Sequence, residues 1–91
     1  GGVALLTKVL GVEWCRGGVN VNAIGPAFTE TSMTRPYLER AGWREQVLGK
    51  IPMGRLGEPR DVVGAAVFLA SAASDFVVGQ TIYVDGGRTL G

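Results

Sequence analysis

The segment Asn20–Thr31 holds the residues with the clearest capacity for chemistry. Its sequence, NVNAIGPAFTET, starts as a short apolar run and continues from Pro26 into a loop with hydroxyl side chains. Proline restrains φ and stiffens such a loop, while backbone N–H groups and threonine hydroxyls form directional hydrogen bonds. This pattern is typical of a buried strand whose carboxyl end opens into a loop that holds a cofactor.

Other kinds of site find little support in the composition. The 91 residues include no histidine and one cysteine, Cys15, so neither an internal disulfide nor the usual metal-ligand and histidine-based catalytic arrangements are expected. No metal site is therefore predicted. Cys15 lies in an apolar stretch with helical character, and we interpret it as a small packing residue rather than a reactive thiol.

Charge and hydropathy exclude two further classes of partner. Nine Lys and Arg are interspersed with eight Asp and Glu, giving net charge +1 and no basic cluster that would bind nucleic acid. The uncharged stretch Val62–Ser74 spans 13 residues, whereas a helix needs roughly 20 to cross a bilayer. The first ten residues lack a basic leader and a cleavage site. We expect no nucleic-acid partner, no membrane insertion and a cytoplasmic location.

Helix and strand alternate along the first part of the chain. A helix over Val3–Arg16 has apolar residues on more than one face and ends at Gly17-Gly18. Its faces could cover a sheet and a partner subunit, or lie deep within one monomer. The run Val19–Ile24 predicts a strand buried on both faces, in which Asn20 and Asn22 should find hydrogen-bond partners in neighbouring loops.

The remaining segments predict a flap, a helix and a strand. From Pro26 to Lys50 the pattern loosens into short helical pieces, and we interpret residues 32–50 as a mobile substrate flap. Pro59 opens an apolar helix, Pro59–Ala73, that is expected to lie in the core. Thr81–Asp85 forms the last strand and is closed by Gly86-Gly87.

Two strands joined through helices predict a parallel pair in an α/β fold. A buried parallel sheet needs more strands than two. The chain also opens on Gly1 and holds no complete catalytic constellation. We therefore expect residues 1–91 to be the carboxyl-terminal segment of a single larger domain, inactive by itself.

Three motifs resemble the carboxyl-terminal third of classical short-chain dehydrogenases/reductases. They are N-A-I-x-P-[GA]-x-x-x-T at Asn22–Thr31, R-x-G-x-P at Arg55–Pro59, and V-D-G-G at Val84–Gly87. The resemblance covers nearly all of the chain. It implies part of a doubly wound Rossmann-type parallel sheet, with two strands, about two long helices and a helical flap, and NAD or NADP lying across the carboxyl ends of the strands.

The resemblance also implies roles for particular residues. Pro26 and Ala27 would line the nicotinamide, the Thr29 backbone would bond its carboxamide, and the Thr31 side chain would anchor the carboxamide or a phosphate. Capping of the next helical turn by Thr29 and Thr31 is the structural alternative. The residues that could border the substrate, or instead form the core of the flap, are Phe28, Tyr37, Leu38 and Trp43.

The chain departs from the family pattern in three ways. Ala27 stands where glycine is usual, and Arg88 follows V-D-G-G where an apolar residue is expected. The family's catalytic tyrosine precedes a lysine by four residues, but Ala41 follows Tyr37 and Gly87 follows Tyr83 at that spacing. No catalytic residue is therefore assigned within the chain.

Three functions remain open at this point. The resemblance implies a piece of an NAD(P)-dependent oxidoreductase acting on a secondary alcohol or ketone, such as a sugar acid, a polyol or a 3-oxoacyl substrate, in a homodimer or homotetramer. A non-catalytic interaction remnant of the same fold is the second possibility. A bare nucleotide-binding module is the third, although the chain has no glycine-rich pyrophosphate turn.

Overall fold

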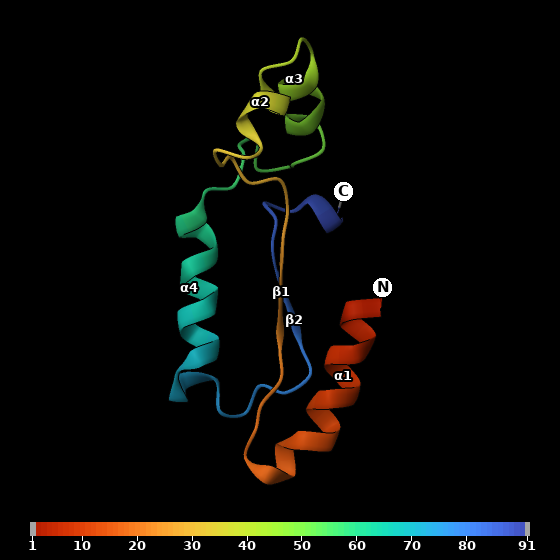
Figure 1. Cartoon of the computed structure of the whole chain (residues 1–91), viewed down its shortest axis with the longest axis vertical. Helices are drawn as coiled ribbons and strands as arrows, with labels where there is room; N and C mark the ends of the chain where they lie inside the picture. The colour runs from red at the N-terminus through yellow and green to blue at the C-terminus, as the bar shows by residue number, and fades with distance from the viewer. Residues whose placement is uncertain (1, 91) are drawn as a thin grey trace. The chain divides into compact units, whose positions relative to one another are not determined.

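The computed structural model describes residues 2–90, and their elements follow the order α1, β1, α2, α3, α4, β2 (Figure 1). The bounds are α1 Gly2–Trp14, β1 Ala23–Pro26, α2 Arg35–Leu38, α3 Trp43–Leu48, α4 Pro59–Ala70 and β2 Thr81–Val84, with short 3₁₀ turns at Cys15–Gly17, Ala72–Ser74 and Arg88–Leu90. The chain divides into two compact units. The first holds residues up to Gly25 together with Gly64–Ile82, and the second holds Pro26–Val63 together with the residues from Tyr83 onward.

Strands β1 and β2 form a two-stranded parallel sheet, which confirms the α/β prediction. The Ala23 N–H donates to the Gln80 carbonyl at 2.9 Å, and the Ala27 N–H donates to the Val84 carbonyl at 3.4 Å. The offset between partners is the same at both ends of the strands, as a parallel register requires.

Strand β1 begins at Ala23, so the prediction of a strand over Val19–Ile24 is wrong at both ends. The two asparagines explain the late start. The Asn20 amide donates to the Asp75 carbonyl at 3.0 Å, while the Asn22 amide donates to the Val77 carbonyl at 2.9 Å. These side-chain bonds replace ladder bonds before Ala23 and confirm that both asparagines are paired. Pro26 ends the strand, where a ladder N–H is no longer needed.

Helix α1 contacts the turn before β2 within the first unit. Gly11 is buried, and a Cβ at this position would lie 2.9 Å from both the Cα and the N of Gly79. The helix continues into the 3₁₀ turn and stops at Gly18, whose φ of 85° confirms the predicted glycine stop. Cys15 lies half-buried in that turn and is not part of a packed core.

Both long helices keep apolar residues exposed within residues 2–90. On α1, Val3 and Val12 are each 72% exposed, and on α4 no residue is buried. The prediction that α4 is a core helix is therefore not met, because a two-stranded sheet offers too little surface to cover it. The helix also ends at Ala70 rather than Ala73, since Ser71 turns to an extended conformation and a 3₁₀ turn follows.

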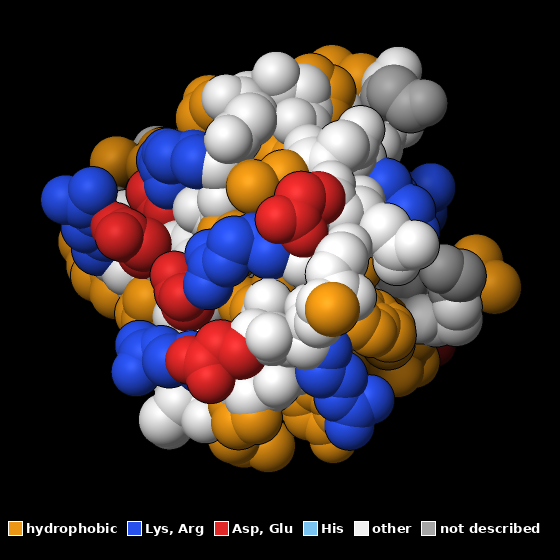
Figure 2. Space-filling view, turned by 90° about the horizontal axis from the view of Figure 1, so that it is seen from above, with side chains coloured by type: hydrophobic (Ala, Val, Ile, Leu, Met, Phe, Trp, Pro, Cys, Tyr) orange, Lys and Arg blue, Asp and Glu red, His pale blue; other side chains and the backbone are white. Residues whose placement is uncertain are grey.

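The buried hydrophobic cluster lies in the second unit. Leu38 of α2 and Val47 of α3 pack with Ile51 and Leu56. The helical pieces of segment 32–50 therefore share a core with residues 51–58, the connector between the flap and α4. Figure 2 shows acidic and basic side chains intermixed on one face of the molecule, without a large basic patch on that face. Among residues 2–90, no helix combines the length and apolar character needed to span a membrane.

Candidate functional site

The candidate site lies in the second unit, where β1 and β2 reach their carboxyl ends. Ligands of open α/β sheets bind outside this edge of the parallel strands. A cavity of about 360 Å³ opens there, lined by Ala27 and Phe28 after β1 and by Asp85 and Gly86 after β2. Its size falls within the range of small-molecule sites.

The turn after β2 gives the cavity a wall without side chains. Gly86 and Gly87 have φ angles of 60° and 93°, a region that favours glycine. The Asp85 carboxylate accepts the N–H of Gly87 at 2.9 Å and the N–H of Thr89 at 3.1 Å. Hydrogen bonds from Thr89 and Gly87 lower the pKa of Asp85, so this carboxylate stays charged and holds the turn.

The loop after β1 pairs with Gly57 of the connector through backbone hydrogen bonds. The Gly57 N–H donates to the Phe28 carbonyl, and the Glu30 N–H donates to the Gly57 carbonyl, both at 2.9 Å. Thr29 lies between these bonds, and within residues 2–90 its own N–H has no acceptor. This N–H is a donor that could bind a carbonyl oxygen of a ligand.

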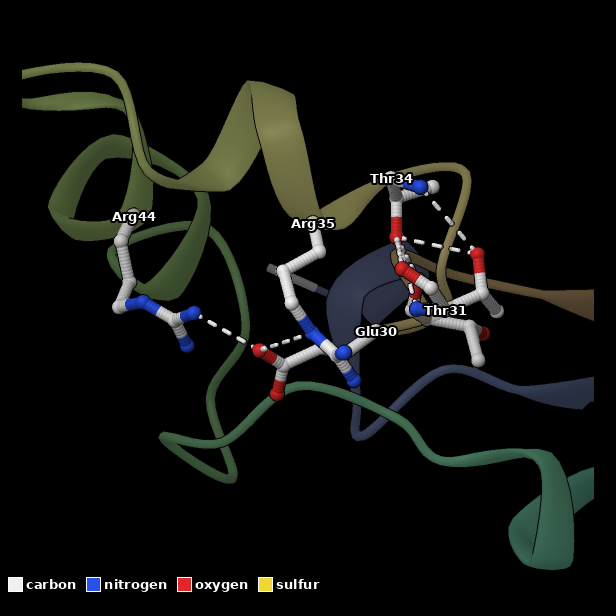
Figure 3. Close-up of polar contacts among 6 residues, drawn as sticks. Glu30, Thr31, Thr34, Arg35 and Arg44 are labelled. Atoms are coloured by element: carbon white, nitrogen blue, oxygen red, sulfur yellow. Dashed lines mark hydrogen bonds and ion pairs between the residues drawn. The ribbon is translucent and has the colours of Figure 1, made fainter.

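Thr31 and Thr34 form a compact network at the start of the flap (Figure 3). The Thr34 N–H donates to the Thr31 hydroxyl at 3.3 Å, and the Thr34 hydroxyl donates to the Thr29 carbonyl at 2.7 Å. The Arg35 N–H donates to the Thr31 carbonyl at 2.9 Å. The N-cap of α2 is Thr34, so the Thr31 hydroxyl accepts an N–H one residue before that helix, while the Thr29 hydroxyl donates to the Ala27 carbonyl at 3.3 Å. A ligand would have to share the Thr31 hydroxyl with Thr34.

The cavity includes only some of the residues predicted to contact a ligand. Ala27 and Phe28 line it, and Thr29 lies next to them. Leu38 is buried in the hydrophobic cluster, which is the position expected if it forms the core of the flap. Tyr37 and Trp43 are exposed on the flap and do not line the cavity, and Pro26 ends β1.

Besides Asp85, two charged residues that the sequence analysis did not assign to the site line the cavity. The Arg55 guanidinium binds the Asp61 carboxylate through two hydrogen bonds of 2.9 and 3.2 Å. The Asp61 carboxylate also accepts the Glu58 N–H at 2.7 Å and so caps the start of α4. The sequence did offer a signal for Asp61, because an acidic residue in the first turn of a helix is favourable and often caps it. Nothing in the sequence pattern indicates that Arg55 is its partner.

Asp61 should contribute acid-dependent stability. Its hydrogen bonds with Arg55 and then with the Glu58 N–H lower its pKa from 3.8 to about 2. Because the folded-state pKa is depressed, the stabilisation is complete above the ordinary pKa of 3.8 and disappears as the pH falls through about 2. Urea unfolding of the protein expressed from its native gene should show that Asp61→Asn costs stability at pH 6 and little at pH 2. Asp75→Asn, at an exposed carboxylate outside this pair, is the control; equal pH profiles for the two variants would contradict the assignment.

No group of three or more His, Cys, Asp or Glu side chains in residues 2–90 is arranged to bind a metal ion. The polar groups of the site are backbone amides, hydroxyls and paired charges. Such groups can orient a bound molecule through directional hydrogen bonds.

Comparison with known proteins places the chain in a family. The family model described as enoyl-(acyl carrier protein) reductase matches residues 1–89. The chain is 47% identical over 85 residues to 2-dehydro-3-deoxy-D-gluconate 5-dehydrogenase of Bacillus subtilis, covering 93% of the chain and 34% of the relative. The chain therefore belongs to this family of short-chain dehydrogenases/reductases, as its motifs predict.

Solved structures agree with this membership. A protein of Agrobacterium tumefaciens with NADP bound, provisionally assigned as a 2-deoxy-D-gluconate 3-dehydrogenase, has 48% identity and a TM-score of 0.94 over 99% of this chain and 37% of its own. A gluconate 5-dehydrogenase of Burkholderia cenocepacia in complex with NADP and tartrate has 43% identity and a TM-score of 0.90, over 98% and 35%. The chain spans about a third of the length of the curated relatives it matches.

Proposed function

We propose that this chain forms part of an NAD(P)-dependent oxidoreductase that moves hydride between a nicotinamide and a secondary alcohol or ketone. The observation that supports this most directly is the cavity at the carboxyl ends of β1 and β2, whose lining residues Ala27 and Phe28 directly precede Thr29 in the chain. The likeness to structures with NADP bound supports the same cofactor here. Bound at this edge, the nicotinamide would supply or accept the hydride.

In this proposal the residues of the chain orient the cofactor. The Thr29 N–H would donate to the carboxamide, and Ala27 would lie against the ring. Thr31 would add a hydroxyl contact while keeping its bond with Thr34. The pairing of this loop with Gly57 restrains it, and restraint of this kind is what positions a reacting carbon.

Proton transfer is assigned outside the 91 residues. Neither Tyr37 nor Tyr83 has a lysine four residues later, so we propose that the tyrosine and lysine implied by the resemblance precede Gly1 in the native protein. We also propose that residues 1–91 are inactive alone and belong to one Rossmann-type domain. The assembly would be a cytoplasmic homodimer or homotetramer.

Sugar acids and polyols are the proposed substrates, with 3-oxoacyl compounds as the next class. The relatives named for gluconate derivatives support the first class. The test is to express the protein from its native gene and follow NADPH and NADH formation with gluconate, 2-dehydro-3-deoxygluconate and galactitol. The reverse reaction is measured with a 3-oxoacyl thioester. Turnover of one class identifies the substrate, and inactivity with all of them contradicts the proposal.

A non-catalytic interaction remnant is the second candidate, favoured by the exposed apolar residues of α1 and α4. The coding DNA upstream of Gly1 separates the two candidates. A lysine codon immediately before Gly1, with a tyrosine codon four positions before that lysine, supports the enzyme. A start codon or unrelated sequence favours the remnant.

Trp43→Ala tests the proposed substrate flap. In the protein expressed from its native gene, the substrate KM should rise about fivefold while the cofactor KM changes little, because an aromatic contact contributes on the order of 1 kcal/mol. Trp14→Ala is the matched control, since Trp14 is similarly exposed but lies on α1. An unchanged substrate KM in the Trp43 variant would remove this residue from the substrate site.

A further inference from the structure

Glu30 occupies a special place in the loop after β1. It lies between Thr29 and Thr31, the two residues proposed to hold the cofactor amide. Its carboxylate accepts a hydrogen bond from the Arg44 guanidinium at 2.8 Å, and the Arg35 side chain lies 4.0 Å away (Figure 3). The side chain of Glu30 therefore connects the loop to both flap helices.

Arg44 links α3, the second helix of the flap, to this loop. It is the second residue of α3, and the same helix contributes Val47 to the buried cluster. A guanidinium on an anchored helix has less freedom to move than one on a loose segment. The hydrogen bond from Arg44 lowers the pKa of Glu30, so the pair stays ionised at neutral pH.

The backbone of the loop Thr29–Thr31 is bonded to Gly57 and to the start of the flap. The Glu30 N–H donates to the Gly57 carbonyl, and the Thr34 hydroxyl donates to the Thr29 carbonyl while accepting the Thr31 N–H. The Glu30 carboxylate adds a direct bond to Arg44 of α3. A shift of α3 would thus reach the loop directly through this pair.

We propose that Glu30 and Arg44 are positioning residues that couple segment 32–50 to the loop Thr29–Thr31. The ion pair holds the Thr29 N–H and the Thr31 hydroxyl in their places, so cofactor affinity depends on a contact made by the substrate flap. Coupling of this kind is reciprocal. If a bound substrate stabilises α3 and raises the affinity for the cofactor, the bound cofactor raises the affinity for the substrate by the same factor. This inference rests on the proposed function.

The first test needs no ligand. Hydrogen exchange is followed by mass spectrometry in the protein expressed from its native gene, comparing wild type with Arg44→Met. Exchange of residues 29–34 should be about two- to fivefold faster in the variant, as for loss of a partly exposed ion pair, while peptides containing Leu38 and Val47 stay protected. Arg60→Met is the matched control, because Arg60 also pairs with a glutamate but at the start of α4. Equal exchange in wild type and Arg44→Met overturns the coupling.

The second test measures the cofactor directly. The Kd for NADP should rise about two- to fivefold in Arg44→Met, and Arg44→Lys should recover part of the affinity. Glu30→Gln combined with Arg44→Met should be no weaker than the worse single variant, since both remove one contact. Additive losses overturn the proposal. A wild-type protein that binds neither NADP nor NAD contradicts the proposed function, and the exchange experiment still decides the coupling.

Discussion

Gly86→Ala should lower the free energy of unfolding of the protein expressed from its native gene by about 2 to 5 kcal/mol. At φ 60° a residue with a side chain costs about 1 to 2 kcal/mol. The added Cβ would also lie 2.7 Å from Ile51 Cγ2, and overpacking of this kind costs roughly 1 to 3 kcal/mol. Ile51 cannot yield easily, because it belongs to the buried cluster with Leu38 and Val47.

Gly54→Ala is the control for this prediction. Gly54 has φ 82°, yet a Cβ at this position meets nothing within 4 Å. Gly54→Ala should lose only the free energy of placing a side chain at positive φ. The difference in the free energy of unfolding between the two variants, measured in urea, therefore gives the cost of the contact with Ile51. A loss for Gly86→Ala no greater than that for Gly54→Ala would contradict the close approach of Ile51. Because Gly86 also lines the cavity, its substitution should weaken NADP binding in the protein expressed from its native gene.

Gly11→Ala should destabilise the chain although alanine is the better helix former. Within a helix the change normally gains about 1 kcal/mol. At this position the new Cβ would lie 2.9 Å from two backbone atoms of Gly79, which cannot rotate away as a side chain can. We expect the steric cost, roughly 1 to 3 kcal/mol, to exceed the propensity gain and leave a net loss of up to about 2 kcal/mol.

Gly64→Ala provides the opposite case. Gly64 lies inside α4, and a Cβ at this position meets nothing within 4 Å. The substitution should therefore stabilise α4 by about 0.5 to 1 kcal/mol through helix propensity alone. Thermal unfolding of both variants checks the prediction through the sign of the change. Stabilisation by Gly11→Ala would show that α1 does not approach Gly79 closely.

Local signals in the sequence were sufficient for most elements. Gly18 stops the first helical segment, Pro59 opens α4, and the strand before Gly86 lies where its β-branched residues place it. Each of these features depends on the conformational preferences of a few neighbouring residues. The start of β1 was missed because the amides of Asn20 and Asn22 bond to residues far along the chain.

The sequence by itself determined the family, the parallel α/β arrangement and the loop that carries Thr29 and Thr31, because these follow from motifs and short-range patterns. Only the tertiary structure decided which side chains meet. It paired Glu30 with Arg44 and Arg55 with Asp61, and it placed Leu38 in a buried cluster rather than at the cavity. Ion pairs and cavity walls depend on how distant segments fold back on one another. Residue type and spacing leave that geometry open.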